Sequence, residues 1–329
     1  MPLKIEDCAQ APEGFFTDHA EGDRFYESIK AAGLADFDFG YLVIYRDGCV
    51  VTIAPYFTMD FRLNTMLPVG RMKRMLAGVK FKLACIGHPC ADFGRIHGEV
   101  SEETLSWISG ALAKKGRLLA FKGFPDALPL SGFVQAVGLP VPVVSLSPTY
   151  FSDLKSDRRN LLTRKLKKAA TLRYEEHDGV PPAYVDRIFS LYLQTYEKAE
   201  VKFELLNREY FRSTCPISKY LLFFEGDHLI GFTQLIGSRD YLINRYIGLD
   251  YSRSDPYGLY FAMFIRAVQF GIRENYSTLE LGATSYEFKR ILGARLVPTW
   301  NYYRHTSPFV HWILGKMKVM LEPSESELK

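Results

Sequence analysis

The stretch from Leu229 to Arg304 constrains the fold of this chain more than any other part of the sequence. It holds apolar runs of β-forming residues, a break at Pro256, an amphipathic helical pattern and a further strand that leads into LELGATSYEFKRILGA. Consecutive elements of this kind pack side by side, so the helix must return the chain to the same sheet. This order aims a helix N-terminus at the end of a sheet, where unpaired N–H groups and the helix dipole attract anions.

The second half of the chain predicts an antiparallel meander followed by a crossover helix. Three apolar runs, LLFFEG, DHLIGFTQLIG and YLINRYIGLD, are joined by short polar turns. Pro256 and Tyr257 open a helix that extends to about Arg273 and has its apolar positions on one face. Strands are expected at 278–281 and 299–305, and helices at 182–196, 207–214 and 286–292.

The first half predicts a thinner version of the same order. Two strands from Phe39 to Phe57 flank the turn Arg46-Asp47-Gly48 and form a hairpin. A helix near Asp23, a helix at 102–115 capped by Ser101 and a strand at 117–121 complete this half. Prolines recur from 125 to 148 and discourage helices there, so we place a domain boundary near residue 148. The sequence predicts an α+β fold with a degenerate duplication.

Composition favours a globular protein. The chain has 329 residues, of which 47% are hydrophobic and 24% charged, so two domains of about 150 residues are expected. No apolar run reaches the roughly 18 residues of a membrane span, and the N-terminus lacks a secretory pattern, so a cytoplasmic location is expected. Five scattered cysteines make a poor disulfide framework. Cys85, His88 and Cys90 in CIGHPC lack a fourth ligand at metal-site spacing, and no metal is predicted.

The segment KSDRRNLLTRKLKKAATLR, from Lys155 to Arg173, concentrates positive charge in a chain whose net charge is only +4. Leucines recur near helical spacing between the basic positions, which predicts an amphipathic helix with a cationic face. Such a face is either simply solvated or a platform for an anionic partner. CoA phosphates, a nucleic acid and an acidic membrane are the three partners considered.

Four motifs in order make residues 150–304 resemble the GNAT acyltransferase superfamily. They are LKSDRRNLLTRKLKKA, LYLQTYEKAEVKFELLNREYF, YLINRYIGLD and LELGATSYEFKRILGA. The resemblance is to the bacterial two-domain branch related to FemAB proteins and to peptidoglycan biosynthesis/recognition N-acyltransferases. It implies two tandem GNAT-like domains, each a mixed, mostly antiparallel sheet flanked by helices. The expected division is a degenerate domain at 1–148, an acyltransferase domain at 149–308, and a C-terminal helix with a mobile tail at 309–329.

The resemblance also implies where a donor would bind. In this superfamily the sheet splits between its fourth and fifth strands, here 241–248 and 278–281, and the pantetheine arm of acyl-CoA lies in the gap. The pyrophosphate would meet the loop 251–259, with Arg253, Tyr257 and Gly258 as candidate contacts. The usual glycine-rich loop is not intact, because Gly258 is its only glycine here. Acyl-CoA would be a co-substrate, and no permanently bound cofactor is expected.

Three residues are candidates for catalysis. Glu280 lies between two leucines in a strand expected to be buried, where desolvation would raise its pKa and suit it to act as a base. Its alternative is a salt bridge to Lys289 or Arg245. Tyr246 and Asn244 are two residues apart and should project from one face of the opposite strand, where they could donate to an oxyanion. Packing is the alternative for the tyrosine.

Three further residues are candidates for binding the substrate. Arg245 should point to the other face of its strand and needs an anionic partner, which could be structural, such as Asp250 or Glu204. Tyr286 and Lys289 follow the turn at Gly282, where loops of such sites gather. Lys289 could hold a carboxylate or phosphate of the acceptor, or lie solvated on the surface.

Three functions remain open at this point. The first is transfer of an acyl group from acyl-CoA, or from a carrier-protein thioester, to the amine of a small molecule. The second is a FemAB-like transferase that uses aminoacyl-tRNA, favoured by the basic helix and by 14% aromatic residues. The third is a recognition module without catalysis. The C-terminal pattern from Phe309 to Met320 is a helix that either docks on the core or contacts a membrane peripherally.

Overall fold

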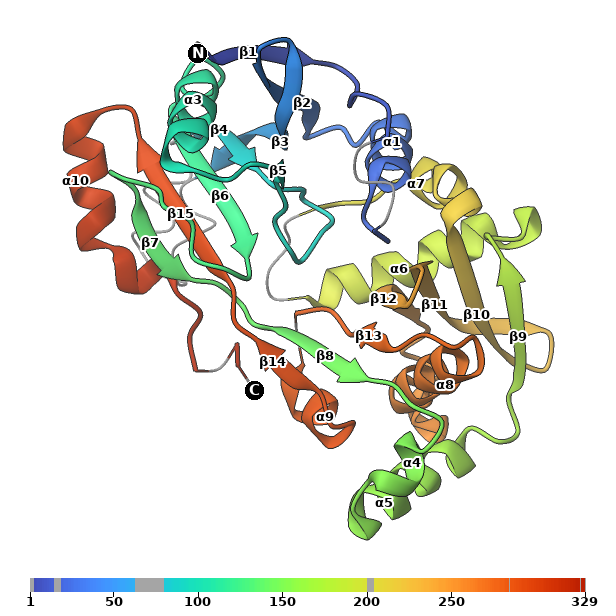
Figure 1. Ribbon diagram of the computed structural model, residues 1–329. Coiled ribbons are helices and arrows are strands. Elements are labelled where there is room, and N and C mark those ends of the chain that lie inside the picture. Colours follow the sequence, from blue (N-terminus) through green and yellow to red (C-terminus); the bar gives the residue numbers. More distant parts are fainter. Residues whose placement is uncertain are drawn as a thin grey trace. The chain divides into compact units, whose positions relative to one another are not determined.

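The computed structural model describes residues 3–14, 19–62, 80–199, 204–283, 285–325 and 327–328 (Figure 1). The chain forms two compact units. Unit 1 comprises Met1–Phe15, Ala35–Val141 and Val297–Lys329, and unit 2 comprises Phe16–Leu34 and Pro142–Leu296. Positions 200–203 of the motif LYLQTYEKAEVKFELLNREYF, position 284 of LELGATSYEFKRILGA, and positions 326 and 329 of the tail lie outside the described residues.

Unit 1 is built on a mixed sheet. Its main path runs β1 (Leu3–Cys8), β2 (Asp38–Arg46), β3 (Cys49–Arg62), β4 (Lys80–Ile86), β6 (Leu118–Phe124), β15 (Trp300–His305) and β7 (Val134–Val137), and β5 (His97–Gly98) pairs with β3. Helix α3 (Glu102–Leu112) packs Leu105, Ile108 and Leu112 onto this sheet. Helix α10 (Pro308–Lys316) and the 3-10 turn η5 (Lys318–Leu321) follow β15.

Unit 2 repeats the plan. Its sheet runs β9 (Arg173–Asp178), β10 (Ser218–Glu225), β11 (His228–Ser238), β12 (Tyr241–Leu249), β13 (Thr278–Glu280), β8 (Val141–Ser145) and β14 (Arg295–Val297). Its helices are α1 (Asp23–Ala32), α4 (Tyr150–Asp153), α5 (Ser156–Lys168), α6 (Val185–Lys198), α7 (Arg208–Ser213), α8 (Leu259–Arg273) and α9 (Tyr286–Ile291). Short 3-10 turns are η2 (Pro182–Tyr184), η3 (Cys215–Ile217) and η4 (Asp255–Tyr257).

Both sheets follow the same sequence of pairings, which confirms the predicted α+β fold with a duplicated domain. In each sheet four antiparallel strands are followed by one parallel pair, β4 with β6 in unit 1 and β12 with β13 in unit 2. Helices α3 and α8 make the crossovers that a parallel pair requires. The sheet next receives a strand from a distant part of the chain, β15 in unit 1 and β8 in unit 2.

These distant strands make the compact units differ from the contiguous division expected at residues 148 and 308. Strand β8 ends at Ser145 and pairs with β13, so this segment belongs to the second sheet although it precedes the proline-rich boundary. Strand β15 pairs with β6 and β7 of the first sheet. Helix α1 packs against α7 and belongs to unit 2. Strand pairing between residues more than a hundred positions apart leaves no local mark in a sequence.

Local signals in the sequence are confirmed at several turns and caps. The Asp47-Gly48 turn has φ of 54° and 81°, the left-handed pair that a two-residue hairpin loop needs. Ser101 caps α3 in a capping box with Thr104. The helix expected to open at Pro256 begins instead at Leu259, because Gly258, with φ of 56°, separates η4 from α8.

Helices cover both faces of the unit 2 sheet. On one face, here called the α8 face, residues of α5 and α8 pack with sheet residues such as Leu235, Leu242 and Leu279. On the other, here called the α6 face, Phe232 contacts Phe211 of α7, and Gly248 lies against the backbone of α6. A Cβ at Gly248 would meet the backbone of Leu191 at 2.8 Å, so only glycine lets α6 approach the strand this closely.

We expect Gly248→Ala to destabilise the protein by about 1–3 kcal/mol, because the added methyl group overpacks the contact between α6 and β12. Thermal and urea unfolding of the two proteins measure this loss. Gly110→Ala is the matched control: it makes the same substitution in α3, where nothing lies within 4 Å of the new Cβ. That variant should be neutral or more stable by roughly 0.5–1 kcal/mol. Equal effects of the two substitutions would contradict the close approach at Gly248.

Candidate functional site

The candidate site lies where strands β12 and β13 separate. Their parallel register pairs Tyr241 with Thr278, Leu242 with Leu279 and Ile243 with Glu280, and β12 then continues alone on this side to Leu249. In unit 1 the pairing of β4 with β6 likewise ends with the shorter strand, at Ile86, while β6 continues to Phe124. In unit 2 the pairing ends with β13, as expected where a sheet splits between its fourth and fifth strands, and Glu280 lies at this end.

A β-bulge in β12 decides which way the site residues point. The register with β11 pairs Gln234 with Tyr246 but the next residue, Leu235, with Asn244, so Arg245 is the extra residue. Leu235 belongs to the core of the α8 face, and Asn244 across from it shares that face. Gln234 bonds to Tyr210 of α7, and Tyr246 across from it shares the α6 face.

The bulge makes two sequence predictions wrong. Asn244 and Tyr246 were expected on one face because strands alternate with period two, but the extra residue between them puts them on opposite faces. Arg245 was expected to point to the face opposite that of Tyr246, but its guanidinium lies 5.6 Å from the centre of the Tyr246 ring. A bulge has no reliable signal in a single sequence, so periodicity alone could not place these side chains.

Glu280 is fully buried and points to the α6 face, because its neighbour Leu279 belongs to the opposite core. The Tyr241 hydroxyl donates to Glu280 Oε2 at 2.7 Å. His19 contacts Tyr241 from the segment that precedes α1, with ring centroids 5.4 Å apart. Sequence analysis missed Tyr241 and His19. Tyr241 could have been found, since it is two residues from Ile243 on the strand paired with Glu280, whereas His19 comes from a remote segment.

Arg245 forms a buried ion pair with Glu21. The Nη1 to Oε1 distance is 2.6 Å, and the two side chains are 6% and 1% exposed. Glu21 follows His19 in the segment before α1 and was not among the partners considered from the sequence. This pair ties that segment to the bulge of β12 on the same face as Glu280. Charges this deeply buried require a partner, so the arginine has a structural role at the border of the site.

Tyr246 lies on the α6 face among other tyrosines. Its hydroxyl donates to Glu204 Oε1 at 2.8 Å, and its ring makes edge contacts with Tyr192 of α6 and Tyr210 of α7. Tyr246 therefore packs against aromatic rings, which was the expected alternative to a catalytic role, and it also makes a polar contact. Tyr246 is half-buried on the part of β12 that has separated from β13.

Asn244 is the polar residue of the α8 face at the split. It is 3% exposed, and neither Oδ1 nor Nδ2 has a hydrogen-bond partner among the described residues. Leaving a buried amide unpaired costs about 1–3 kcal/mol, so such groups call for an explanation. A donor arm inserted between β12 and β13 would supply partners for this amide.

The loop that precedes α8 uses most of its amides internally. The N–H groups of Arg253 and Ser254 donate to Asp250 O, those of Tyr257 and Leu259 donate to Ser254 O, and that of Gly258 donates to Asp255 O. The N–H groups of residues 251 and 252 donate to side chains of Gln194 and Asp250. A pyrophosphate site needs several amides that are free to bind an anion. This loop has few to offer.

Two of the candidate phosphate contacts, Arg253 and Tyr257, bind a carboxylate instead. Arg253 Nη1 lies 2.5 Å from Glu225 Oε2, and the Tyr257 hydroxyl donates to Glu225 Oε1 at 2.6 Å. These hydrogen bonds, from Tyr257 first and Arg253 second, hold the pKa of the Glu225 carboxyl below its usual value. Gly258 takes the left-handed conformation that ends η4. The loop is thus closed by Glu225 of β10.

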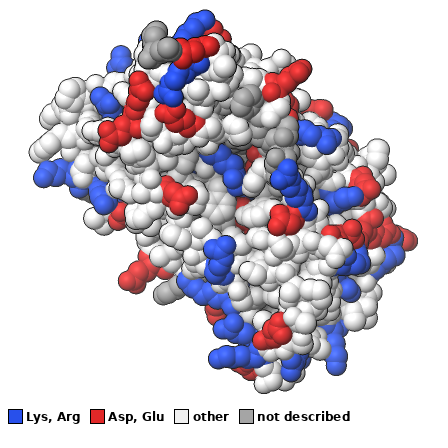
Figure 2. Space-filling model, in the orientation of Figure 1, with Lys and Arg blue, Asp and Glu red and all other residues white. Residues whose placement is uncertain are grey.

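The basic helix α5 lies beside this loop. Lys165 lies 3.6 Å from the ring centre of Phe261 in the first turn of α8, and a Cβ at Gly258 would lie 3.9 Å from Lys168 Cδ. Leu162 is buried on the α8 face, which confirms the amphipathic pattern. The exposed cations of this helix form no ion pair with other described residues; they are Arg158, Arg159, Arg164, Lys167 and Lys168. Figure 2 shows basic side chains gathered where Figure 1 labels α5.

The remaining predicted residues lie just beyond β13. Lys289 is 2% exposed, and its Nζ donates to Gly282 O at 2.8 Å, so it is neither solvated nor open to a ligand. Tyr286 is fully buried at the start of α9. Both residues hold α9 against the end of β13. Within the described part of the chain, no group of three His, Cys, Asp or Glu residues is placed to hold a metal ion.

The order of strands, the crossover helix and the split between the fourth and fifth strands define the GNAT fold in its two-domain FemAB-like form. No protein-family model matches the chain, and no curated protein matches it. Among solved structures, the C-terminal domain of a protein assigned as a lysylphosphatidylglycerol synthetase from Agrobacterium fabrum is similar, with a TM-score of 0.58 and 13% identity over 92% of each chain.

Two further structures support the same fold. FemX is similar with a TM-score of 0.55 and 10% identity, over 89% of this chain and 93% of its own. A tandem GNAT protein from the clavulanic acid biosynthesis pathway has a TM-score of 0.50 and 11% identity, over 93% of this chain and 99% of its own. At these identities the likeness establishes the fold, and the predicted GNAT-superfamily, FemAB-like fold is confirmed.

We expect Arg245→Met to destabilise the protein by about 3–5 kcal/mol, because it leaves the Glu21 carboxylate buried without its cation. The double variant Glu21→Gln/Arg245→Met should recover much of this loss, as a double-mutant cycle of unfolding free energies would show. Arg253→Met, which breaks a far more exposed pair, is the control and should cost under about 1 kcal/mol. Additive effects of the two buried substitutions would contradict the coupling.

Proposed function

We propose that the protein transfers an acyl or aminoacyl group to an amine at the split between β12 and β13. The observation that carries this proposal is the division of polar groups between the two faces of the sheet at that split. Asn244 and the basic helix α5 lie on the α8 face, and Glu280 with Tyr241 lies on the α6 face. A donor that enters from the α8 face would present its carbonyl next to an amine bound on the α6 face.

The reaction needs a proton acceptor and a hydrogen-bond donor. The amine nitrogen attacks the ester or thioester carbonyl carbon, and a C–N bond forms as the carbonyl oxygen becomes an oxyanion. The Glu280 carboxylate accepts the proton of the amine, while a hydroxyl such as that of Tyr241 holds the carboxylate in position. The oxyanion then collapses, and the bond to the oxygen or sulfur of the carrier breaks as that atom takes up the proton that Glu280 accepted from the amine.

The loop before α8 favours aminoacyl-tRNA over acyl-CoA as the donor. Its amides bond within the loop, and Arg253 and Tyr257 are engaged by Glu225, which leaves little to bind a pyrophosphate. The unpaired cations of α5 instead form a surface that suits a phosphodiester backbone. The amide of Asn244 would bond to the acyl ester in the split. Acyl-CoA and a carrier-protein thioester stay as the alternative donors.

Titration with aminoacyl-tRNA over a range of salt concentrations tests the donor. We expect the logarithm of the affinity to fall linearly with the logarithm of the salt concentration, and Lys167→Gln/Lys168→Gln to reduce this slope by about one per lost phosphate contact. The control Lys80→Gln/Lys114→Gln removes two exposed lysines of unit 1 and should leave the slope unchanged. Saturable CoA binding with thermal stabilisation, and no tRNA binding, would support acyl-CoA instead.

The rate of amide formation is measured with the same donor under single-turnover conditions. Glu280→Gln should slow this step by about 10²–10⁴-fold without weakening donor binding, because it removes only the proton acceptor. If Glu280→Gln and Tyr246→Phe both leave the biological activity intact, the protein acts as a recognition module and catalysis in the split is not its function.

We also propose that the C-terminal helix of unit 1 contacts a membrane surface. No residue of α10 is buried, and large apolar side chains cluster on it and on the turn after it: Phe309 is 69% exposed, Trp312 61% and Val319 82%. The first two rings stack on one another, and Lys316 lies 5.9 Å from the Trp312 ring. Aromatic residues beside lysine suit the interface of a bilayer with anionic headgroups. In the described chain no helix is long and apolar enough to span a bilayer.

Sedimentation with phosphatidylglycerol vesicles tests this contact. We expect the protein to bind them, and Phe309→Ser/Trp312→Ser to weaken binding by at least about tenfold, because two large apolar side chains no longer enter the interface. Trp107→Ser is the matched control, since this tryptophan is also exposed in unit 1 but lies on α3. Equal losses in both variants, or equal binding to phosphatidylcholine vesicles, would contradict the proposed surface.

A further inference from the structure

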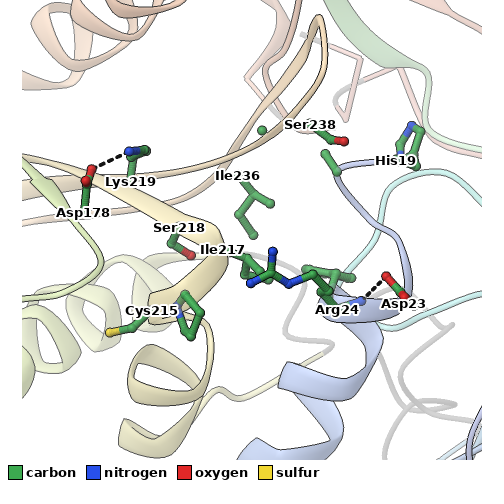
Figure 3. Close-up of a pocket in the computed structure, with 14 residues that line it drawn as sticks. His19, Asp23, Arg24, Asp178, Cys215, Ile217, Ser218, Lys219, Ile236 and Ser238 are labelled. Atoms are coloured by element: carbon green, nitrogen blue, oxygen red, sulfur yellow. Dashed lines mark hydrogen bonds and ion pairs between the residues drawn. The ribbon is translucent and has the colours of Figure 1, made fainter. Parts of the chain in front are cut away.

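A pocket of about 610 Å³ lies on the α6 face of unit 2, at the edge where β10 begins and β11 ends. The N-terminal turn of α1 forms one wall, and η3 with the start of β10 forms the other (Figure 3). Ile217 and Ile236 give it an apolar floor, and Ser218 and Ser238 provide hydroxyl groups. Its volume falls in the range of about 300–1,000 Å³ that is usual for small-molecule sites.

Two charged side chains that line this pocket, Asp23 and Arg24, form no ion pair with a described residue. Lys219 pairs with Asp178, and the carboxylate of Asp23 accepts a hydrogen bond from the backbone N–H of Arg24 at 2.7 Å. The Arg24 guanidinium forms no ion pair with any described residue, and Figure 3 shows its side chain extending from the start of α1 toward Ile217. Since Lys219 is paired with Asp178, the Arg24 guanidinium is the cation of this pocket that can bind a ligand, and the Asp23 carboxylate beside it keeps its own negative charge. A fork of N–H donors beside hydroxyl groups is suited to a single carboxylate.

The pocket adjoins the proposed reaction centre. Ser238 lines it and is directly opposite Tyr241 in the β11–β12 pairing, so their side chains share the α6 face. Tyr241 in turn donates to Glu280. His19 lines the pocket and contacts the Tyr241 ring. A molecule bound against Arg24 therefore has a short path along one face of the sheet to Glu280.

We propose that this pocket binds the amine acceptor by a carboxylate group, which makes the acceptor an amino acid or a short peptide with a free C-terminus. The inference rests on the proposed transferase function and names its acceptor class. Arg24 holds the carboxylate, the floor of Ile217 and Ile236 takes an apolar side chain, and the amine is directed toward Tyr241 and Glu280. A phosphate dianion would bring two negative charges next to the Asp23 carboxylate, so the pocket favours a monoanion.

Binding of L-leucine and L-leucinamide to the full-length protein, measured by calorimetry, tests the proposal. The two probes share side chain and amine, but the amide lacks the carboxylate. We expect leucine to bind at least about tenfold more tightly than leucinamide, because a charge-assisted fork is lost with the amide. Arg24→Gln should remove this difference, Arg24→Lys should restore part of it, and inorganic phosphate should not displace leucine.

Two further variants keep the test independent of folding and of the transferase assignment. Ile217→Trp fills the pocket and should abolish binding of both probes. Arg295→Gln removes an exposed arginine on β14, at the opposite edge of the sheet, and should change nothing. Failure of leucine to bind, or equal binding of leucine and leucinamide, overturns the pocket. If transfer to an amine without a carboxylate is then unaffected by Arg24→Gln, the transferase function stands while this inference fails.

Discussion

The three-residue pairing between β12 and β13 is the constraint on which the candidate site depends. Parallel strands that stay paired expose no backbone between them, so a substrate can reach the middle of the sheet only where pairing stops. In unit 2 it stops at Ile243 and Glu280. Tyr241 and Asn244 of β12 and Glu280 of β13, the groups nearest the proposed reaction, lie at or next to this end of the pairing.

Because of the bulge at Arg245, the two faces of β12 carry different kinds of side chain beyond its pairing with β13. Without the extra residue, Asn244 and Tyr246 would share a face, and one of them would lie in the wrong environment. The shift places the amide of Asn244 in the core of the α8 face and Arg245 against Glu21 on the α6 face. A buried ion pair gives little net stability. Here it fixes the segment before α1, which carries His19 and leads to the pocket at Arg24.

The sequence predicted elements far better than it predicted contacts between them. The strands from β10 to β12, helix α8 and the caps at Ser101 and Asn207 follow from period, turn chemistry and capping residues, which are all local properties. Glu280 was identified because an acid between two leucines of a strand is locally unusual. Strands β1, β4 and β9 were not predicted.

What the sequence could not predict depends on distant pairing. The partners Glu21 and Tyr241, and the exchange of β8 and β15 between the two sheets, are set by residues far away along the chain. The same applies to Arg253 and Tyr257, which the resemblance implied as phosphate contacts, because both side chains bind Glu225 of β10. A motif shows which groups are near one another in sequence. It does not show whether a carboxylate from a distant part of the chain binds them.

The two units differ in the side chains found at the end of their parallel strand pairs. In unit 1 the parallel strands β4 and β6 remain paired to Ile86, whose partner Phe121 is fully buried. The equivalent end of pairing in unit 2 is Ile243 with Glu280. The parallel pairing therefore ends in an apolar pair in unit 1 and beside a carboxylate in unit 2. Since both sheets share their strand order, the difference lies in which side chains end the pairing, and a candidate site is defined by such side chains and not by the order of the strands.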